Sequence, residues 1–430
     1  MNSEEKAPIG VVGVGWVGLV TAACFAELGH RVIARDVLQE KVDSLNRGEV
    51  TIHEPGLEAL LEKNRERLTF TTDMDELLDA VRLIFVCVDT PPTYSGDADL
   101  SRVQAVVRDL KEDGDHVLIM KSTVPAGTGD AIRRELPGMA YVSCPEFLKE
   151  GTAVEDFMHP DRVVVGAEPE DADAAGEVAD LYRPLGGEIV MTDTSSAEMI
   201  KLASNAYLAT RISFINEIAN VCEEVGADVG EVARGMGLDE RIGPHFLRPG
   251  IGFGGSCFPK DVNALKLLAG NSGYHFQLLN SVIEVNELQK RRVVSKLAKH
   301  LGSLVGKRIA LLGLAFKPDT DDMREASSLV LSARLRGEGA EVVAYDPVAM
   351  DNARTLLPGV EMMDTAQEAL TDCDAAVLVT EWSEFRDIDW NEAAERMRRP
   401  LLIDGRNFLD PDVLGSAGFL YEGIGRTGNR

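Results

Sequence analysis

Short, continuously apolar runs alternate with helix-like periodic segments through the first half of this chain. A fully apolar run is typical of a strand buried on both faces of a parallel sheet, and residues 83–88 form such a run. The alternation predicts repeated strand–helix–strand units and therefore an α/β fold. The predicted strands are Pro8–Gly13, Arg31–Arg35, Leu83–Val88, Val117–Met120, Tyr141–Cys144 and Arg162–Gly166.

The middle of the chain changes to long helical patterns, one from about Ser195 to Gly226 and one from about Phe276 to Leu301. We interpret them as a connector and a dimerisation surface, with a helical cap on one domain as the alternative. The last third returns to the strand–helix theme. Its predicted strands are Lys307–Gly313, Glu341–Asp346, Ala375–Thr380 and Pro400–Asp404.

Three glycines, Gly13, Gly15 and Gly18, follow the first predicted strand and open a predicted helix from Trp16 to Leu28. In a dinucleotide-binding turn, the first glycine permits the tight turn and the second lets backbone approach the pyrophosphate. The third lets the helix pack closely on the strand. The helix N-terminus then offers unpaired N–H groups to the phosphates. The spacing predicts a dinucleotide site here.

The next predicted strand is followed by Asp36, eighteen residues after Gly18. An acid at this place binds the ribose hydroxyls and repels a 2′-phosphate, so we expect NAD to be preferred to NADP. The neighbouring Arg35 weakens that preference slightly.

A chain of 430 residues is too long for one compact core. We predict two doubly wound, Rossmann-like domains joined by a long central helical segment. The predicted divisions are an NAD-binding domain at 1–194, a central helical connector at 195–302 and a C-terminal domain at 303–430. The last domain lacks the three-glycine signature, so we do not expect it to bind a dinucleotide in the usual way.

The charge balance, 44 basic against 71 acidic residues, gives a net charge of −27. Nucleic-acid binding is disfavoured because phosphate contacts need clustered Lys and Arg, and an anionic membrane is disfavoured for the same reason. High solubility explains the charge, and a salt-rich host is the alternative.

Six cysteines, at 24, 87, 144, 222, 257 and 373, show no C-x-x-C pair and no His at metal-ligand spacing. We expect no metal site, no disulfide framework and a cytoplasmic location. Residues 7–26 carry no charge, but the segment before them is net acidic and glycines interrupt them, which argues against a signal peptide.

Cys257 lies in the glycine-rich run GFGGSCFPKD, residues 252–261, with Pro259 suited to the first turn of a helix. A reactive thiol needs a nearby cation or a helix N-terminus, and Lys260 follows closely. A buried structural cysteine is the alternative. Combined with a nicotinamide-type site, a reactive cysteine indicates an alcohol oxidised to an aldehyde, captured by sulfur and oxidised again to an acid.

A series of motifs resembles the UDP-glucose/GDP-mannose dehydrogenase family in order and spacing over nearly the whole chain. The motifs are GVGWVG (13–18), IHEPGLEALL (52–61), KSTVPAGT (121–128), PEFLKEGTA (145–153), HPDRVVVG (159–166), AEMIKLASNAYLATRISFINEIA (197–219), RIGPHFL (241–247), PGIGFGGSCFPKDV (249–262), GLAFKPDTDDMRE (313–325) and DGRNFLD (404–410). The resemblance implies a twofold oxidation of the sugar at C6 with two NAD and a cysteine-bound intermediate.

The resemblance also implies roles for individual residues. The catalytic set is Cys257 as nucleophile, Asp261 as general base, Lys201 and Asn205 beside developing oxyanions, Glu146 in thioester hydrolysis, and Thr123 holding water. The implied cofactor contacts are Gly13, Gly15, Trp16, Val17, Gly18, Asp36, Lys41, Thr90, Pro91, Thr123, Glu150 and Arg324. The implied substrate contacts are Phe147, Leu148, Glu150, Lys201, Asn205, Arg241, Phe253, Gly254, Lys317 and Arg406.

In the family, an arginine matching Arg241 reaches the partner subunit's site, so the resemblance implies a homodimer or a larger homo-oligomer. The C-terminal domain is expected to bind the UDP-sugar. Two positions depart from the family pattern: Cys144 stands where Asn is common, and Asp89 replaces an uncharged residue.

Residues 251–253 and Phe258, around the GGSC core, resemble the UDP-glucose type within the family, and on this resemblance alone we expect UDP-glucose as the substrate. The same chemistry on GDP-mannose or on a UDP-N-acetylhexosamine is the nearest alternative. A non-catalytic nucleotide-sugar binding protein and a simple alcohol dehydrogenase are the other hypotheses, and neither needs a reactive cysteine.

Overall fold

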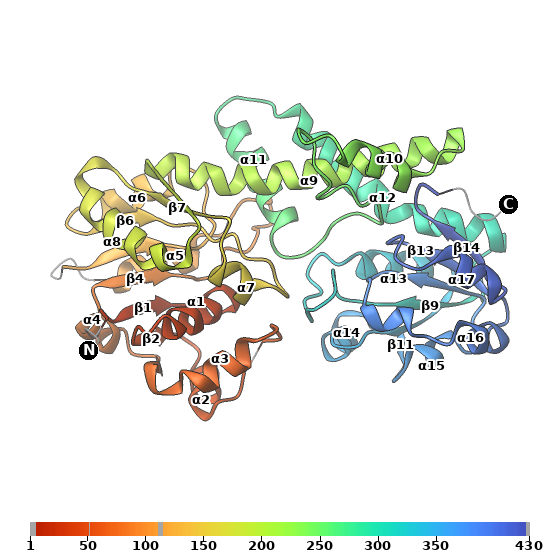
Figure 1. The fold of residues 1–430 in the computed structure, drawn as a ribbon, viewed down its shortest axis with the longest axis horizontal. Helices are drawn as coiled ribbons and strands as arrows, with labels where there is room; N and C mark the ends of the chain where they lie inside the picture. The colour runs from red at the N-terminus through yellow and green to blue at the C-terminus, as the bar shows by residue number, and fades with distance from the viewer. Residues whose placement is uncertain (1–5, 51, 111–114, 427–430) are drawn as a thin grey trace. The chain divides into compact units, whose positions relative to one another are not determined.

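The computed structural model describes residues 6–50, 52–110 and 115–426 and contains two separate sheets (Figure 1). The chain divides into two compact units. The first is Met1–Ser204 with Asn263–Gly273, and the second is Asn205–Val262 with Tyr274–Arg430. The long helix α9 (Thr194–Val225) joins them, close to the helix predicted from about Ser195 to Gly226.

The first unit is built on an eight-stranded sheet in the order β3-β2-β1-β4-β5-β6-β7-β8. Its strands are β1 (Ile9–Val12), β2 (Val32–Arg35), β3 (Leu68–Thr71), β4 (Leu83–Val86), β5 (Val117–Met120), β6 (Ala140–Ser143), β7 (Arg162–Gly166) and β8 (Glu188–Thr192). Neighbouring strands are parallel except β6 and β7, which pair antiparallel through Ser143 and Gly166. The predicted parallel sheet is therefore confirmed with one exception, because the link between β6 and β7 does not carry the chain back across the sheet.

Helices cover both faces of this sheet, because successive side chains of each strand point to opposite sides. In β1, Val11 belongs to a buried cluster that includes residues of α1, α7 and α8, whereas Val12 belongs to a second cluster that includes residues of α4, α5 and α6. The helices of the unit are α1 (Trp16–Glu27), α2 (Gln39–Arg47), α3 (Leu57–Lys63), α4 (Met74–Ala80), α5 (Ser101–Asp109), α6 (Thr128–Glu135), α7 (Ala153–Met158) and α8 (Ala172–Tyr182).

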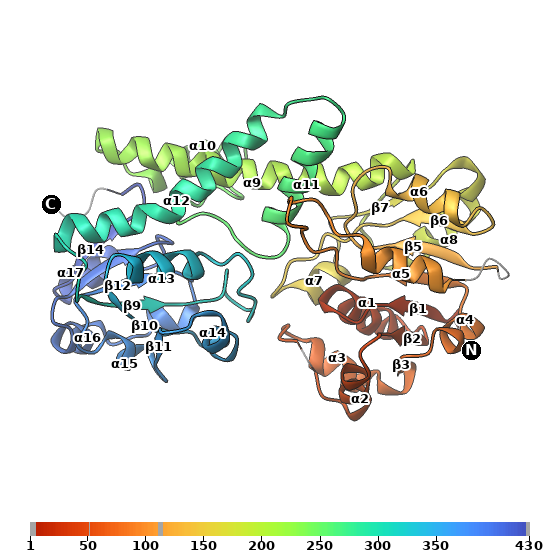
Figure 2. The ribbon, with the colours of Figure 1, turned by 180° about the vertical axis from the view of Figure 1, so that it is seen from behind.

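The second unit has a six-stranded, fully parallel sheet in the order β11-β10-β9-β12-β13-β14, the doubly wound order of a Rossmann fold. Its strands are β9 (Arg308–Leu312), β10 (Glu341–Tyr345), β11 (Glu361–Met362), β12 (Ala375–Leu378), β13 (Leu401–Asp404) and β14 (Leu420–Gly423). Helix α12 (Gln277–Leu301) packs on α13 (Ser327–Gly337), as Figure 2 shows. The other helices are α10 (Val229–Gly237), α11 (Phe258–Asn271), α14 (Met350–Leu356), α15 (Ala366–Leu370), α16 (Trp390–Arg396) and α17 (Pro411–Ser416).

Asp346 directly follows β10 in the second unit, just as Asp36 directly follows β2 in the first unit. Its fully buried carboxylate accepts hydrogen bonds from the N–H of Leu314 at 2.6 Å, the N–H of Ala315 at 3.1 Å and the indole N–H of Trp382 at 3.0 Å. This acid is part of the interior.

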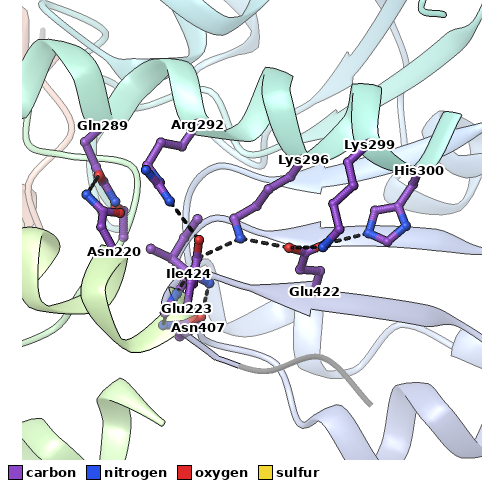
Figure 3. A network of polar contacts seen from close by, with 12 residues as sticks. Asn220, Glu223, Gln289, Arg292, Lys296, Lys299, His300, Asn407, Glu422 and Ile424 are labelled. Carbon is purple, nitrogen blue, oxygen red and sulfur yellow. Dashed lines mark hydrogen bonds and ion pairs between the residues drawn. The ribbon is translucent and has the colours of Figure 1, made fainter. Parts of the chain in front are cut away.

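A buried polar network fastens β14 to the two long helices within the second unit (Figure 3). The Nζ of Lys296 on α12 lies 2.7 Å from Glu223 on α9 and 2.8 Å from Glu422 on β14. Burial alone would raise the pKa of both carboxyls, but the hydrogen bonds from Lys296 hold each pKa below its usual range. Arg292 also pairs with Glu223, and Lys299 and His300 also pair with Glu422, so one network links α9, α12 and β14.

Among the residues that the structure describes, no helix is long and apolar enough to cross a membrane. The uncharged stretch at 7–26 forms β1, the glycine turn and most of α1. The acidic residues 1–5 before it lie outside the described residues.

Candidate active site

The glycine turn after β1 has the geometry that a pyrophosphate needs. Gly13 adopts φ +92°, and a Cβ on Gly18 would lie only 1.8 Å from the carbonyl oxygen of Gly13. A Cβ on Gly15 would meet nothing nearer than Oδ1 of Asp89 at 3.6 Å, so this side of the turn is open. No side chain caps α1, and its first turn, which includes Trp16 and Val17, has no acid. These N–H groups fit an anion.

The carboxylate of Asp36 is held beside this turn. It accepts hydrogen bonds from the N–H of Val14 and of Leu38, each at 3.0 Å, and the Nζ of Lys41 lies 3.3 Å away. The side chain is largely buried, so its orientation is fixed before any ribose arrives. Each oxygen keeps acceptor capacity for a hydroxyl group.

The guanidinium of Arg35 is held by groups outside the glycine turn. Its Nε donates to the carbonyl of Thr72 and its Nη2 pairs with Asp109, both at 3.3 Å. The charge that was expected to weaken the NAD preference is therefore directed to other partners.

Replacing Asp36 by alanine should reduce the preference for NAD over NADP, measured as the ratio of kcat/KM values, by about tenfold or more. The reason is that the variant would lose the carboxylate that we expect to accept hydrogen bonds from the ribose hydroxyls and to repel a 2′-phosphate. The ratio is the useful measurement because general damage to the turn affects both cofactors. Asp109→Ala, which changes only the partner of Arg35, is the control. Unaltered ratios in Asp36→Ala would refute the assignment.

Two loops at the carboxyl ends of β4 and β5 are joined. The hydroxyl of Thr90 donates to the carbonyl of Thr123 at 2.8 Å, and the hydroxyl of Ser122 donates to the carbonyl of Val88 at 2.7 Å. Ligands of doubly wound sheets bind at this edge. The structure thus brings Thr90, its neighbour Pro91 and Thr123 together.

Glu54, which the sequence analysis did not single out, connects the glycine turn to the segment after β6. Its Oε2 accepts hydrogen bonds from the indole N–H of Trp16 at 3.0 Å and the N–H of Gly151 at 2.8 Å. Its Oε1 accepts the N–H of Ala153 at 2.8 Å, at the start of α7. Glu150, expected to contact both ligands, directly precedes Gly151. The signal that could have identified Glu54 was its place in the IHEPGLEALL motif, where it is the first of two acids.

Lys201 and Glu146 form a buried ion pair within the first unit. Their Nζ and Oε1 atoms lie 2.8 Å apart, and each side chain is only 5% exposed. The other oxygen of Glu146 accepts the N–H of Leu148 at 2.6 Å. The ring of Phe147 lies beneath the Arg162 guanidinium, 3.8 Å away, and 5.4 Å from Nζ of Lys201. Four predicted site residues are thus brought together.

Cys257 directly precedes α11, and the N–H of Asp261 donates to its carbonyl at 2.9 Å. The partial positive charge at a helix N-terminus stabilises a thiolate. Of the six cysteines, all within the described ranges, Cys257 alone is not buried. Burial raises the pKa of Cys24, Cys87 and Cys373 to about 12 and also raises that of Cys144 and Cys222.

Asp261 is nearly inaccessible, at 1% exposure, but its oxygens are paired. Oδ2 accepts a hydrogen bond from the Asn205 amide and Oδ1 one from the Lys260 ammonium, both at 2.6 Å. Asn205 follows Lys201 by four residues on α9, so both side chains leave the helix on one face.

Three buried amides hold the backbone just before the cysteine. Asn286 accepts the N–H of Phe253 at 2.7 Å and donates to its carbonyl at 3.1 Å. Gly250 is held in the same way: its carbonyl accepts a hydrogen bond from the Gln289 amide at 2.9 Å, and its N–H donates to the Asn216 amide oxygen at 2.8 Å. These three residues were not predicted, because their partners are main-chain groups far away in the sequence.

The glycines of the cysteine loop pack on the segment around residues 324–326. A Cβ on Gly254 would lie 2.2 Å from the carbonyl oxygen of Glu325, and the N–H of Gly255 donates to the carbonyl of Arg324 at 2.9 Å. Arg406 donates to the carbonyl of Gly252 at 3.1 Å and to that of Phe316 at 3.2 Å.

Three other predicted cations lie as follows. Lys317 lies over the Phe316 ring at 5.5 Å. Arg324 pairs with Asp322 at 2.7 Å. Arg241 pairs with Asp239 at 2.6 Å, with its side chain 89% exposed.

Comparison with known proteins gives three consecutive matches to domains of one family. They are the NAD binding domain of the UDP-glucose/GDP-mannose dehydrogenase family at residues 7–186, its central domain at 195–288 and its UDP binding domain at 310–411. The UDP-glucose 6-dehydrogenase TuaD of Bacillus subtilis is 44% identical over 98% of this chain and 94% of its own. The chain belongs to the UDP-glucose/GDP-mannose dehydrogenase family.

Comparison with solved structures supports the same family. A UDP-glucose dehydrogenase from Pyrobaculum islandicum superimposes with a TM-score of 0.92 at 36% identity, covering 99% of both chains. A UDP-D-ManNAc dehydrogenase from Pyrococcus horikoshii gives a TM-score of 0.85 at 28% identity, covering 97% of this chain and 99% of its own. The predicted resemblance and α/β class are confirmed, and this member of the family is an NAD-dependent nucleotide-sugar dehydrogenase.

The two departures from the family pattern have simple local structures. Cys144 is fully buried in the core beside the sheet of the first unit. Asp89 pairs with Arg102 at 2.9 Å near the surface. Neither substitution removes one of the predicted catalytic groups.

Proposed function

We propose that this dehydrogenase oxidises UDP-glucose twice at C6 to UDP-glucuronate, consuming two NAD. Relatives named UDP-glucose 6-dehydrogenase, including those from Bacillus subtilis and Rhizobium meliloti, support this substrate. The observation that carries the chemistry is the accessibility of Cys257 at the start of α11, while every other cysteine is buried. A dehydrogenase that stops at the aldehyde needs no such thiol.

When bound, NAD would accept a hydride from C6 in each of the two oxidations. In the first oxidation the hydroxyl proton passes to a base, the role proposed for Asp261 with an ordered water. The Cys257 sulfur then adds to the aldehyde carbon, giving a thiohemiacetal, and stabilising the oxygen of this adduct is the role proposed for Lys201 and Asn205. Loss of a second hydride from the same carbon, together with the hydroxyl proton of the thiohemiacetal, gives a thioester. Water cleaves it with help from Glu146 and Thr123, releasing the acid and restoring the thiol.

Binding roles follow the three-part division at 1–194, 195–302 and 303–430. The first part would hold NAD through its glycine turn, Asp36 and Lys41. The last part would hold the UDP moiety, with Lys317 and Arg406 as the cations that overcome the net charge of −27. The family matches at 7–186, 195–288 and 310–411 support these assignments.

The test is an assay of purified protein with UDP-glucose and NAD, in which we expect two NADH and one UDP-glucuronate per sugar consumed. GDP-mannose and UDP-N-acetylhexosamines are assayed in parallel, because the structural neighbours include dehydrogenases of such sugars. A higher kcat/KM with one of these would replace UDP-glucose as the substrate. Binding without NADH formation would leave only a nucleotide-sugar binding protein.

We also propose a homodimer formed through α9. Tyr207, Phe214 and Val221 recur every seven residues and are 61%, 49% and 56% exposed, an apolar stripe suited to a second copy of the same helix. Light scattering should give twice the monomer mass, and Phe214→Asp with Val221→Asp should shift the protein to monomer. A wild-type monomer at micromolar concentration would exclude this interface. We also propose a cytoplasmic location, because the six cysteines, all within the described ranges, form no disulfide with one another; cell fractionation tests it.

A further inference from the structure

Glu198 is a buried carboxylate that the mechanism above does not use. It lies on α9 three residues before Lys201 and is 2% exposed. Its Oε2 accepts the N–H of Gly127 at 2.7 Å and its Oε1 accepts the N–H of Gly129 at 2.8 Å. These N–H groups belong to the start of α6, where a helix has unpaired donors and a partial positive charge. One carboxylate therefore binds the start of another helix through both oxygens.

The contact between α6 and α9 has no room for another side chain. A Cβ on Gly129 would lie 2.4 Å from Cγ2 of Thr194 and 2.6 Å from Cε1 of Tyr141. Gly127 adopts φ +94°, a conformation that favours glycine. The two glycines thus allow the backbone to reach Glu198 directly.

Residues 121–127, between β5 and α6, include Thr123. At one end, Ser122 donates to the carbonyl of Val88, and the carbonyl of Thr123 accepts the Thr90 hydroxyl. At the other end, the N–H of Gly127 is held by Glu198. Since Glu198 and Lys201 are three residues apart on one helix, the carboxylate relates the position of this loop to that of Lys201.

We propose that Glu198 is a positioning residue of the oxidation site, whose ionised carboxylate fixes the Thr123 loop relative to Lys201. The inference rests on the proposed function for the roles of Thr123 and Lys201. Glu198 itself acts only through the backbone it holds.

The charge state of Glu198 should change near neutral pH. Burial raises its pKa to about 7, the hydrogen bonds from Gly129 and Gly127 counter part of the increase, and Asp130 adds to it. Tyr141, whose hydroxyl lies 3.5 Å from Oε1, and Asp130 are the titratable groups that face it from β6 and α6. A protonated carboxyl has an O–H donor and holds two N–H donors less well. Below about pH 7 the loop should therefore loosen.

Activity and stability should then change in opposite directions over the same pH range. The pKa is above its unfolded value of 4.5, so between about 4.5 and 7 the folded state binds more protons than the unfolded state. The contribution of Glu198 to stability is present below 4.5 and is lost as pH rises through about 7. Activity should rise over this range as the carboxylate forms. A merely structural residue would not produce this opposition.

The experiment compares wild type, Glu198→Gln and a control variant, Glu135→Gln. Glu135 is an exposed acid at the end of α6, the helix whose start Glu198 holds. In Glu198→Gln, we expect kcat at pH 8 to fall about 10- to 100-fold with little change in either KM, because a small displacement of catalytic groups has that effect. The acid limb of wild-type kcat near pH 7 should vanish, and the melting temperature should lose part of its pH dependence between pH 5 and 8. The control should behave as wild type.

Hydrogen exchange of the free protein separates this inference from the proposed function. Residues 121–129 should exchange faster at pH 6 than at pH 8, relative to the intrinsic rates, in wild type and the control but not in Glu198→Gln. Wild-type protein that leaves UDP-glucose unoxidised would refute the proposed function, and the exchange data would still decide the anchoring. Unchanged exchange, or wild-type kcat with the same acid limb in Glu198→Gln, would overturn the inference.

Discussion

Cys257→Ala should lower formation of the acid by on the order of 10³-fold or more, because the proposed covalent intermediate forms on the sulfur that the variant lacks. The first oxidation does not require sulfur, so the variant should release traces of aldehyde, trapped with a hydrazine and measured by mass spectrometry. The melting temperature should change little, since the thiol is partly exposed. UDP-glucuronate formed at the normal rate would exclude the thioester mechanism.

A second variant, Cys222→Ala, is the matched control, because Cys222 is a buried cysteine of the second unit. It should keep wild-type activity. Alkylation of the native enzyme by iodoacetamide should label Cys257 alone, since burial raises the pKa of the other five thiols. Labelling of another cysteine before inactivation would contradict this assignment.

Lys201→Met should destabilise the fold by about 3–5 kcal/mol, because it leaves the Glu146 carboxylate buried without its partner. Activity should also fall, by about 10²-fold or more, through loss of the cation that we propose stabilises the developing oxyanion. Urea unfolding measures the first effect and NADH formation the second.

The double variant Lys201→Met with Glu146→Gln distinguishes the two roles of the pair. Removing both charges should recover most of the stability, because an uncharged pair of similar volume is tolerated. It should not recover activity. The exposed pair of Arg234 and Glu231 is the control, and Arg234→Met should cost less than about 1 kcal/mol. A stable, fully active double variant would remove both residues from the mechanism.

The apolar pattern predicted the central strands and both long helices with small boundary errors, but it missed β3, β8, β11 and β14. The β8 strand is mostly exposed or half-buried at an edge of its sheet, and β11 has only two residues. Edge strands lack the continuous burial that makes a run apolar. The antiparallel pairing of β6 and β7 could not be predicted either, since strand direction depends on the path of the link.

Within the site, the sequence by itself determined the features that depend on near neighbours. The glycine turn needs three glycines within six residues, and the cysteine at the start of α11 needs only its own loop and the helix that follows. Asp36 also belongs to this class, because its place follows from the strand after the first helix.

Only the tertiary structure decided which groups hold these local features in place. Glu54 binds backbone 97 and 99 residues away, Glu198 binds backbone 69 and 71 residues away, and Asn286 binds Phe253 across 33 residues. Their partners are main-chain N–H and C=O groups, which every residue except proline presents equally, so no side-chain pattern marks them. Burial of those polar groups makes the contacts necessary, and burial exists only after the sheets and helices have packed.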